Sequence, residues 1–145
     1  MNAIDFLIKE HNRVRKMLAD INDASHREET RRKLFAVLSQ DLIRHEKMEH
    51  AVWYPHFKDR LDDTVKHLVS EEKGAERAIK QLDDTTTTQT WEEKFSKFKK
   101  DVEHHASEEE QILFPKVKTL LSEEELEKIG QDMFHFKQDH HPSTH

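Results

Sequence analysis

Two copies of one short motif carry the residues that could do chemistry. His45 is followed four residues later by Glu49, and His105 is followed at the same spacing by Glu109. On a helix, side chains four residues apart project from the same side, so each imidazole would lie one turn from a carboxylate. A single pair of this kind is commonly a surface salt bridge. Two pairs in the same register, 60 residues apart, instead favour a shared internal site.

The repeat extends beyond these two pairs. Each pair is followed by an aromatic residue and a proline, Tyr54-Pro55 in the first copy and Phe114-Pro115 in the second. The preceding segments also match, because an offset of 61 residues places Glu72 on His11. Both residues lie in apolar stripes with helical spacing. The chain is therefore interpreted as a tandem duplication in which each half supplies one donor and then a His-x3-Glu pair.

Imidazoles and carboxylates buried together are typical of a dinuclear metal site inside a helical bundle. The carboxylates can bridge two ions while the imidazoles complete the coordination, a donor set that suits iron, manganese or zinc. Without a metal, the same cluster would consist of unpaired buried polar groups, which destabilise a folded protein. The predicted metal ligands are His11, His45, Glu49, Glu72, His105 and Glu109.

Two assignments within this set have alternatives. Glu72 follows Glu71, and an ordinary surface glutamate is the competing interpretation at that position. His104 and Glu108 form another His-x3-Glu pair one residue before the second motif, rotated about 100° from the apolar stripe. The register of the following Phe114-Pro115 favours His105 over His104 as the ligand, so we expect His104 to point outward or to support a ligand.

Long amphipathic helices must position these residues. Charged residues make up 37% of the chain and apolar residues 34%, with 2 Gly and 3 Pro, which favours helices over a turn-rich sheet. We expect one domain over residues 1–145, an all-α, up-down-up-down four-helix bundle with a short C-terminal fifth helix. Capping boxes are predicted at residues 25–28, 90–93 and 122–125, and residues 139–145 are interpreted as a His-rich frayed tail. The expected bundle helices cover residues 3–24, 27–57, 62–83 and 91–120, and the extra helix covers 122–138.

Composition excludes several classes of function. The net charge of −6 disfavours nucleic acid as a partner, because phosphate binding requires clustered Lys and Arg. The absence of cysteine excludes disulfides, thiolate catalysis and iron–sulfur clusters. No stretch is apolar enough to span a membrane and no leader peptide precedes the first helix, so a cytoplasmic protein is expected.

Taken together, His11 and the two motifs with their aromatic-Pro pairs resemble the hemerythrin-like HHE cation-binding family, over about residues 4–118. The resemblance implies a left-handed four-helix bundle with a non-haem di-iron centre that binds dioxygen. It further implies that Glu49 and Glu109 bridge the irons and that the three histidines are terminal ligands. The family usually carries a Glu-His pair on the third helix, where this chain has Glu71-Glu72.

This departure bears on function. A third carboxylate would stabilise ferric iron, which favours dioxygen or peroxide reduction, redox sensing or iron handling over reversible oxygen carriage. We expect two iron ions, with manganese or zinc as substitutes, joined by an oxo or hydroxo bridge. Dioxygen, peroxide or nitric oxide is the expected ligand, with weak oxidase- or peroxidase-like activity conceivable and no protein partner identified. The alternatives are an iron store or buffer without turnover, and a metal-free helical interaction module.

Overall fold

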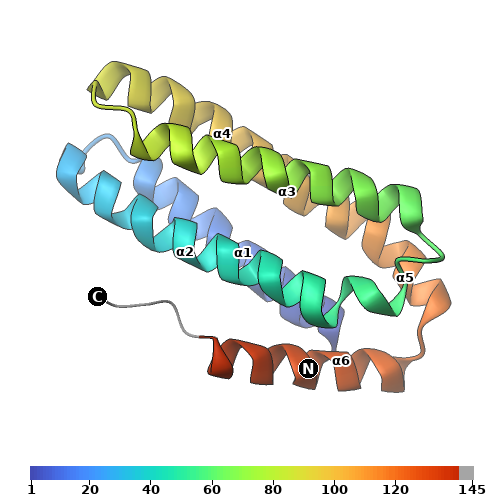
Figure 1. Ribbon diagram of the computed structural model, residues 1–145. Helices are drawn as coiled ribbons and strands as arrows, with labels where there is room; N and C mark the ends of the chain where they lie inside the picture. Colours follow the sequence, from blue (N-terminus) through green and yellow to red (C-terminus); the bar gives the residue numbers. More distant parts are fainter. Residues whose placement is uncertain (141–145) are drawn as a thin grey trace.

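Four long helices run up and down beside one another in the computed structural model, which describes residues 1–140 (Figure 1). A further helix lies along one side of them, and no strand occurs among the described residues. The all-α up-down-up-down bundle with a C-terminal fifth helix is therefore confirmed, while residues 141–145 of the expected tail lie outside the described residues. The bundle helices are α1 (Ala3–Asn22), α2 (Glu28–Val52), α3 (Asp62–Asp83) and α4 (Thr88–Glu108), and the last helices are α5 (Phe114–Leu120) and α6 (Glu123–Asp139).

Helix starts follow the expected capping chemistry at only one of the three predicted capping boxes. Ser122 accepts a hydrogen bond from the backbone N–H of Glu125, and the Glu125 side chain accepts one from the backbone N–H of Ser122. The box predicted at residues 25–28 is wrong, because the cap of α2 is Arg27 and makes no side-chain cap bond. The box predicted at residues 90–93 is also wrong, since α4 begins at Thr88 with Thr87 as its cap.

The two aromatic-Pro segments interrupt their helices in different ways. After Val52 the chain passes into the short 3₁₀ turn η1 (Tyr54–His56), so α2 stops before the expected position 57. Pro55 explains the stop, because proline has no N–H to continue the helix and its ring clashes with the preceding turn. In the second copy the chain remains helical, but through the π-helix η2 (Glu109–Leu113), which directly precedes Phe114-Pro115.

The π-helix corrects one predicted buried position. On a regular α-helix Ile112 would lie on the same side as His105 and Glu109, so helical spacing predicts that it is buried. In the structure 47% of its surface is exposed. A π turn contains more residues than an α turn, so the inward position passes to Leu113, which is fully buried. The wider turn begins at Glu109 itself.

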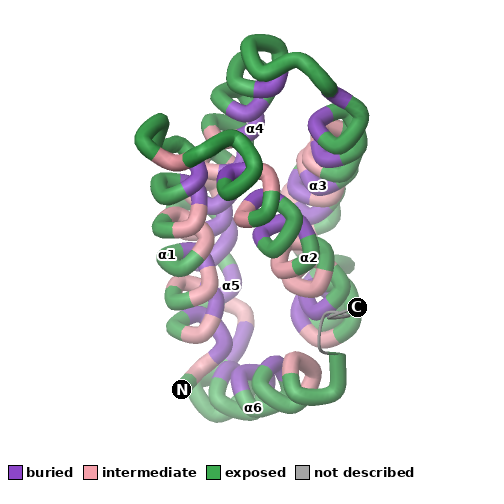
Figure 2. The backbone as a smooth tube through the Cα atoms, turned by 90° about the vertical axis from the view of Figure 1, so that its left-hand side faces the viewer, coloured by how far each residue is buried: buried purple, intermediate pink, exposed green. Residues whose placement is uncertain are grey.

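The predicted metal ligands lie between two hydrophobic clusters. One cluster joins the start of α1, the end of α2 and the helices α5 and α6, with Leu7 and Trp53 among its members. The other joins the end of α1, the start of α2 and the start of α4, around Phe35 and Trp91. Figure 2 shows the buried positions facing the interior of the bundle along its length. The polar site therefore lies at mid-bundle, closed from both ends by apolar side chains.

Helix α6 packs on α1 and α2, on the side away from α3 and α4 (Figure 1). Gly130 of α6 lies against the backbone at the start of α1, so a Cβ atom there would overlap the carbonyl oxygen of Met1. No helix among the described residues is long and apolar enough to cross a membrane.

Two glycine variants test this close approach. Gly130→Ala is expected to lower the free energy of unfolding by about 1–3 kcal/mol, because backbone must move to admit the methyl group. Gly74→Ala is the matched control, since its Cβ would meet only the end of Arg77 at 3.7 Å. Alanine in an open helical position is stabilising by about 0.5–1 kcal/mol. Urea denaturation would measure the free energy of unfolding of both variants. Equal changes in the two variants would contradict this packing of α6 against the start of α1.

Candidate metal centre

Five of the six predicted ligands converge on one buried point. The Nε2 atom of His45 lies 3.2 Å from Oε1 of Glu49, and that of His105 lies 2.9 Å from Oε1 of Glu109. The third imidazole comes from α1, with Nε2 of His11 at 3.9 Å from the same Glu109 oxygen. Both carboxylates are completely buried. The motif spacing thus places each imidazole against its own carboxylate, as a helical turn requires.

These donors form two groups that share one residue. Donor atoms of His11, His45 and Glu109 lie within 4.8 Å of one another, and so do donor atoms of Glu49, His105 and Glu109. Only Glu109 belongs to both groups, which is the position that a bridging carboxylate would occupy.

The donor atoms also lack other partners. Among the described residues, both oxygens of Glu49, both oxygens of Glu109 and Nε2 of His11 are buried without a hydrogen bond. The contact between His105 and Glu109 is close but does not have hydrogen-bond geometry. Buried polar atoms are nearly always satisfied, so five unsatisfied atoms facing one point fit a bound cation.

Glu72 is placed beside this cluster and is not part of either group. It is buried, which rules out the surface interpretation. One of its oxygens lies 2.8 Å from Nε2 of His50, and the other accepts a hydrogen bond of 3.0 Å from the Tyr54 hydroxyl. Relative to the duplication, His50 and Glu72 stand in the places of Glu110 and His11, whose side chains are 2.7 Å apart. The two halves therefore carry the same imidazole–carboxylate pair with its members exchanged.

The aromatic residue of each motif contacts the donor from the other half. Phe114 stacks on the His11 ring, with centroids 6.0 Å apart and planes at 7°. At the equivalent place Tyr54 donates its hydroxyl to Glu72. A phenyl ring faces the imidazole and a phenol faces the carboxylate, so each aromatic residue matches the donor that it contacts.

Each of the three imidazoles is held from behind by a carboxylate that the sequence did not identify. The Nδ1 atoms lie 2.7–3.2 Å from glutamate oxygens and leave Nε2 directed at the cluster. Such contacts orient a metal-binding imidazole and raise its basicity. Each glutamate is adjacent in sequence to a predicted ligand, which is the only signal that could have indicated them. The pairs are His11 with Glu110, His45 with Glu10, and His105 with Glu71.

The electrostatics of the metal-free cluster involve bound protons. Burial and the charges of Glu109 and Glu72 raise the pKa of Glu49 well above its usual range. Burial lowers the pKa of His105, but contact with Glu109 outweighs this and raises it to about 10. The same contact holds the pKa of Glu109 below its ordinary value despite burial. Cation binding should therefore displace protons from Glu49 and His105.

Two cavities adjoin the cluster. A small one of about 30 Å³ touches the three imidazoles and Glu109 and is otherwise lined mainly by apolar side chains such as Val14, Leu18 and Val102. A larger one of about 510 Å³ lies between α2, α3 and α4 and reaches Glu49 and Glu72. Glu46 lines the larger cavity, and burial together with Glu76 and Glu72 raises its pKa to about 9.

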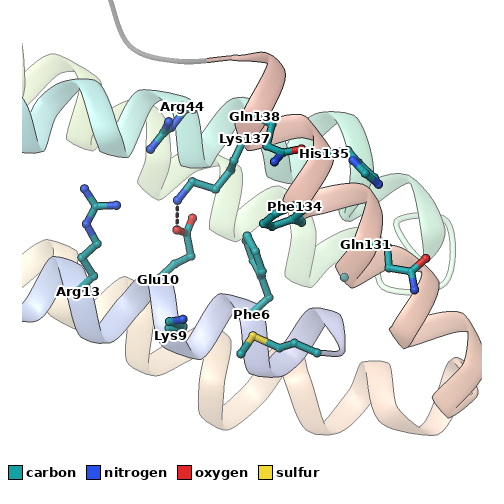
Figure 3. Close-up of a pocket in the computed structure, with 12 residues that line it drawn as sticks. Phe6, Lys9, Glu10, Arg13, Arg44, Gln131, Phe134, His135, Lys137 and Gln138 are labelled. Atoms are coloured by element: carbon teal, nitrogen blue, oxygen red, sulfur yellow. Dashed lines mark hydrogen bonds and ion pairs between the residues drawn. The ribbon is translucent and has the colours of Figure 1, made fainter.

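Helix α6 contributes to the cluster through Glu10. Figure 3 shows Lys137 of α6 reaching the carboxylate of Glu10 on α1, and Glu10 in turn contacts Nδ1 of His45 at 3.2 Å. Burial raises the pKa of Glu10, but the contacts with His45 and Lys137 outweigh it and lower the pKa to about 2. A lysine side chain from α6 thus holds the carboxylate that contacts one imidazole.

Glu10→Gln is expected to weaken the protein in a pH-dependent way. A lowered pKa stabilises the folded state above the ordinary value of 4.5, and this stabilisation is lost as the pH falls towards 2. The variant should lose up to about 3 kcal/mol at pH 6 and show a shallower decline between pH 4.5 and 2. Denaturation of the wild type and the variant at several pH values measures this difference in the free energy of unfolding. In a double-mutant cycle with Lys137→Met, additive losses of stability would contradict the coupling between Glu10 and Lys137.

Comparison with known proteins gives two matches. The model of the family described as Hemerythrin HHE cation binding domain matches residues 2–117. A crystal structure of a Hemerythrin HHE cation binding domain-containing protein from Mycobacterium kansasii is similar, with 26% identity and a TM-score of 0.83, over 95% of this chain and 86% of that one. No curated protein matches significantly. Helix α6 lies beyond the residues that the family model matches.

Proposed function

Because the chain belongs to the hemerythrin HHE cation-binding family, we propose that it holds two iron ions at mid-bundle and binds, senses or reduces dioxygen, peroxide or nitric oxide there. The observation that carries the proposal is Glu109, which shares its donor atoms between two groups of buried, otherwise unsatisfied ligands. One shared carboxylate between two donor groups is the arrangement expected for a pair of ions.

The donor set supports iron, with manganese as its substitute. His11 and His45 would serve one ion, His105 and Glu49 the other, and Glu109 would serve both. Mixed imidazole and carboxylate donors inside a helical bundle are typical of di-iron and di-manganese proteins. Glu72 lines the same cavity as Glu49 and, if released from Tyr54 and His50, would add a third carboxylate.

The small cavity favours a small ligand. Its volume of about 30 Å³ exceeds the ~10–15 Å³ that a single water needs, but it could not admit an organic substrate. Apolar side chains make up most of the rest of its lining, an environment that suits dioxygen and restricts water. We infer that the ligand binds between the three imidazoles.

The surrounding residues would handle protons. Bound iron would supply the electrons for reducing an oxygen ligand. Glu46 retains its carboxyl proton at neutral pH, since its pKa is raised to about 9, and it lines the cavity that reaches Glu49 and Glu72. The Tyr54 hydroxyl holds a proton against Glu72. Both groups would hold protons beside Glu49 and Glu72, on the α3 side of the cluster and outside the small cavity.

The proposal predicts about two irons per chain in untagged protein reconstituted under anaerobic conditions. On exposure to air, a visible absorption band of the ferric pair should appear. Stopped-flow mixing with dioxygen or peroxide then separates the functions: repeated consumption supports reduction, while stable iron without consumption supports the storage alternative. Protein that takes up no iron or manganese under these conditions would contradict the proposal.

A further inference from the structure

A second set of histidines and carboxylates lies on the surface between α3 and α4. His67 and Glu71 are one turn apart on α3, and His104 and Glu108 are one turn apart on α4. Both pairs have the His-x3-Glu spacing of the interior motifs. The outward pair on α4 therefore does not stand alone, because a matching pair on the neighbouring helix faces it.

The four side chains approach one another closely. Nε2 of His67 lies 3.0 Å from Oε2 of Glu108 and 3.6 Å from Oε2 of Glu71. Nε2 of His104 lies 3.8 Å from the same Glu71 oxygen and is also paired with Glu108. Ligand atoms at the corners of a tetrahedron around zinc are about 3.4 Å apart, given bonds of ~2.1 Å. Donor atoms of His67, Glu71 and Glu108 all lie within 4.8 Å of one another, so these three residues can face one such ion, and His104 lies beside them.

The cluster is accessible, and lysine and arginine side chains do not compete for its carboxylates. The imidazoles of His67 and His104 are 60% and 65% exposed, while the carboxylates of Glu71 and Glu108 beneath them are 23% and 16% exposed. Among residues 1–140, no Lys or Arg forms an ion pair with either carboxylate.

We propose that His67, Glu71 and Glu108, with His104 beside them as a further donor, form a second site, for a late first-row divalent cation such as zinc. Two imidazoles and two carboxylates suit zinc, and sites of nitrogen and oxygen donors bind it more tightly than ferrous iron. The site is separate from the interior cluster but adjoins it. The second oxygen of Glu71 contacts Nδ1 of His105 at 2.9 Å, and Glu71 and His104 line the cavity that reaches Glu49.

The test removes the interior cluster and asks whether one site remains. In untagged Glu49→Gln/Glu109→Gln protein, titration with Co²⁺ is expected to give a tetrahedral absorption band that saturates at about one ion per chain. Adding His67→Ala and His104→Ala should abolish the band. The matched control replaces His56 and His135, exposed histidines outside both clusters, and should retain the band.

Each outcome bears on the surface site alone, because this background lacks Glu49 and Glu109, the two carboxylates in the donor groups of the proposed iron site. A band that persists without His67 and His104, or no band in the parent, would overturn the proposal. If the background variant is not folded by circular dichroism, iron-loaded wild type serves instead. Its zinc content after dialysis should exceed that of the His67→Ala/His104→Ala variant by about one ion per chain, and equal contents would overturn the proposal.

Discussion

Glu109→Ala is expected to abolish metal binding at the interior cluster. Glu109 is the one residue shared by both donor groups, so its loss leaves two donors in each. Glu49 belongs to one group, and Glu49→Ala should remove mainly one ion. Iron content measured by elemental analysis should fall from about two per chain to below ~0.5 in the first variant and to about one in the second.

The difference between these variants makes the prediction specific. A general effect on folding would reduce both contents equally, whereas the geometry predicts unequal losses. Glu93→Ala, on the exposed face of α4, is the control and should retain full iron content. Full iron content in Glu109→Ala would contradict the proposed dinuclear site.

Removal of the metal is expected to produce the largest change in stability. Metal-free protein buries two carboxylates whose oxygens have no hydrogen-bond partner among the described residues, and such groups destabilise a fold. Metal binding couples directly to folding. When the free metal concentration is about 1,000 times the dissociation constant, each bound ion raises the free energy of unfolding by ~4 kcal/mol. For a chain of this size that raises the melting temperature by roughly 10 °C or more per ion.

Glutamine variants separate this effect from other roles of the cluster. Glu49→Gln/Glu109→Gln preserves shape but removes the buried charge, so its metal-free form should melt at or above metal-free wild type. It should also gain nothing from added iron. Calorimetry with and without chelator measures both forms. Identical melting of wild type under the two conditions would contradict the coupling and would support the metal-free interaction module.

Helix α6 gives the interior cluster an asymmetry that the duplication does not contain. Glu10 behind His45 is held by Lys137 of α6, while Glu71 behind His105 faces the exposed His67 and His104. The carboxylate behind one imidazole is thus held by a lysine, and the carboxylate behind the other contacts two exposed histidines.

The sequence by itself determined the fold class, the duplication and the face of each helix. Helical spacing alone places His45 with Glu49 and rotates His104 away from His105, because side-chain direction follows position along a helix. The same periodicity identified His11 and Glu72 as buried. Capping boxes in the sequence predicted where three helices begin, and two of these three predictions were wrong. Local capping hydrogen bonds are weak in comparison with the tertiary packing that decides where a helix begins.

Only the tertiary structure decided which atoms meet across helices. The contacts of Glu10 and Glu71 with imidazoles, the capture of Glu72 by Tyr54 and His50, and the π turn at Glu109 all depend on how one helix is shifted and rotated against its neighbour. Periodicity gives the direction of a side chain around its own helix axis. The relative register of two helices comes from the packing of their side chains, which no single stretch of sequence contains.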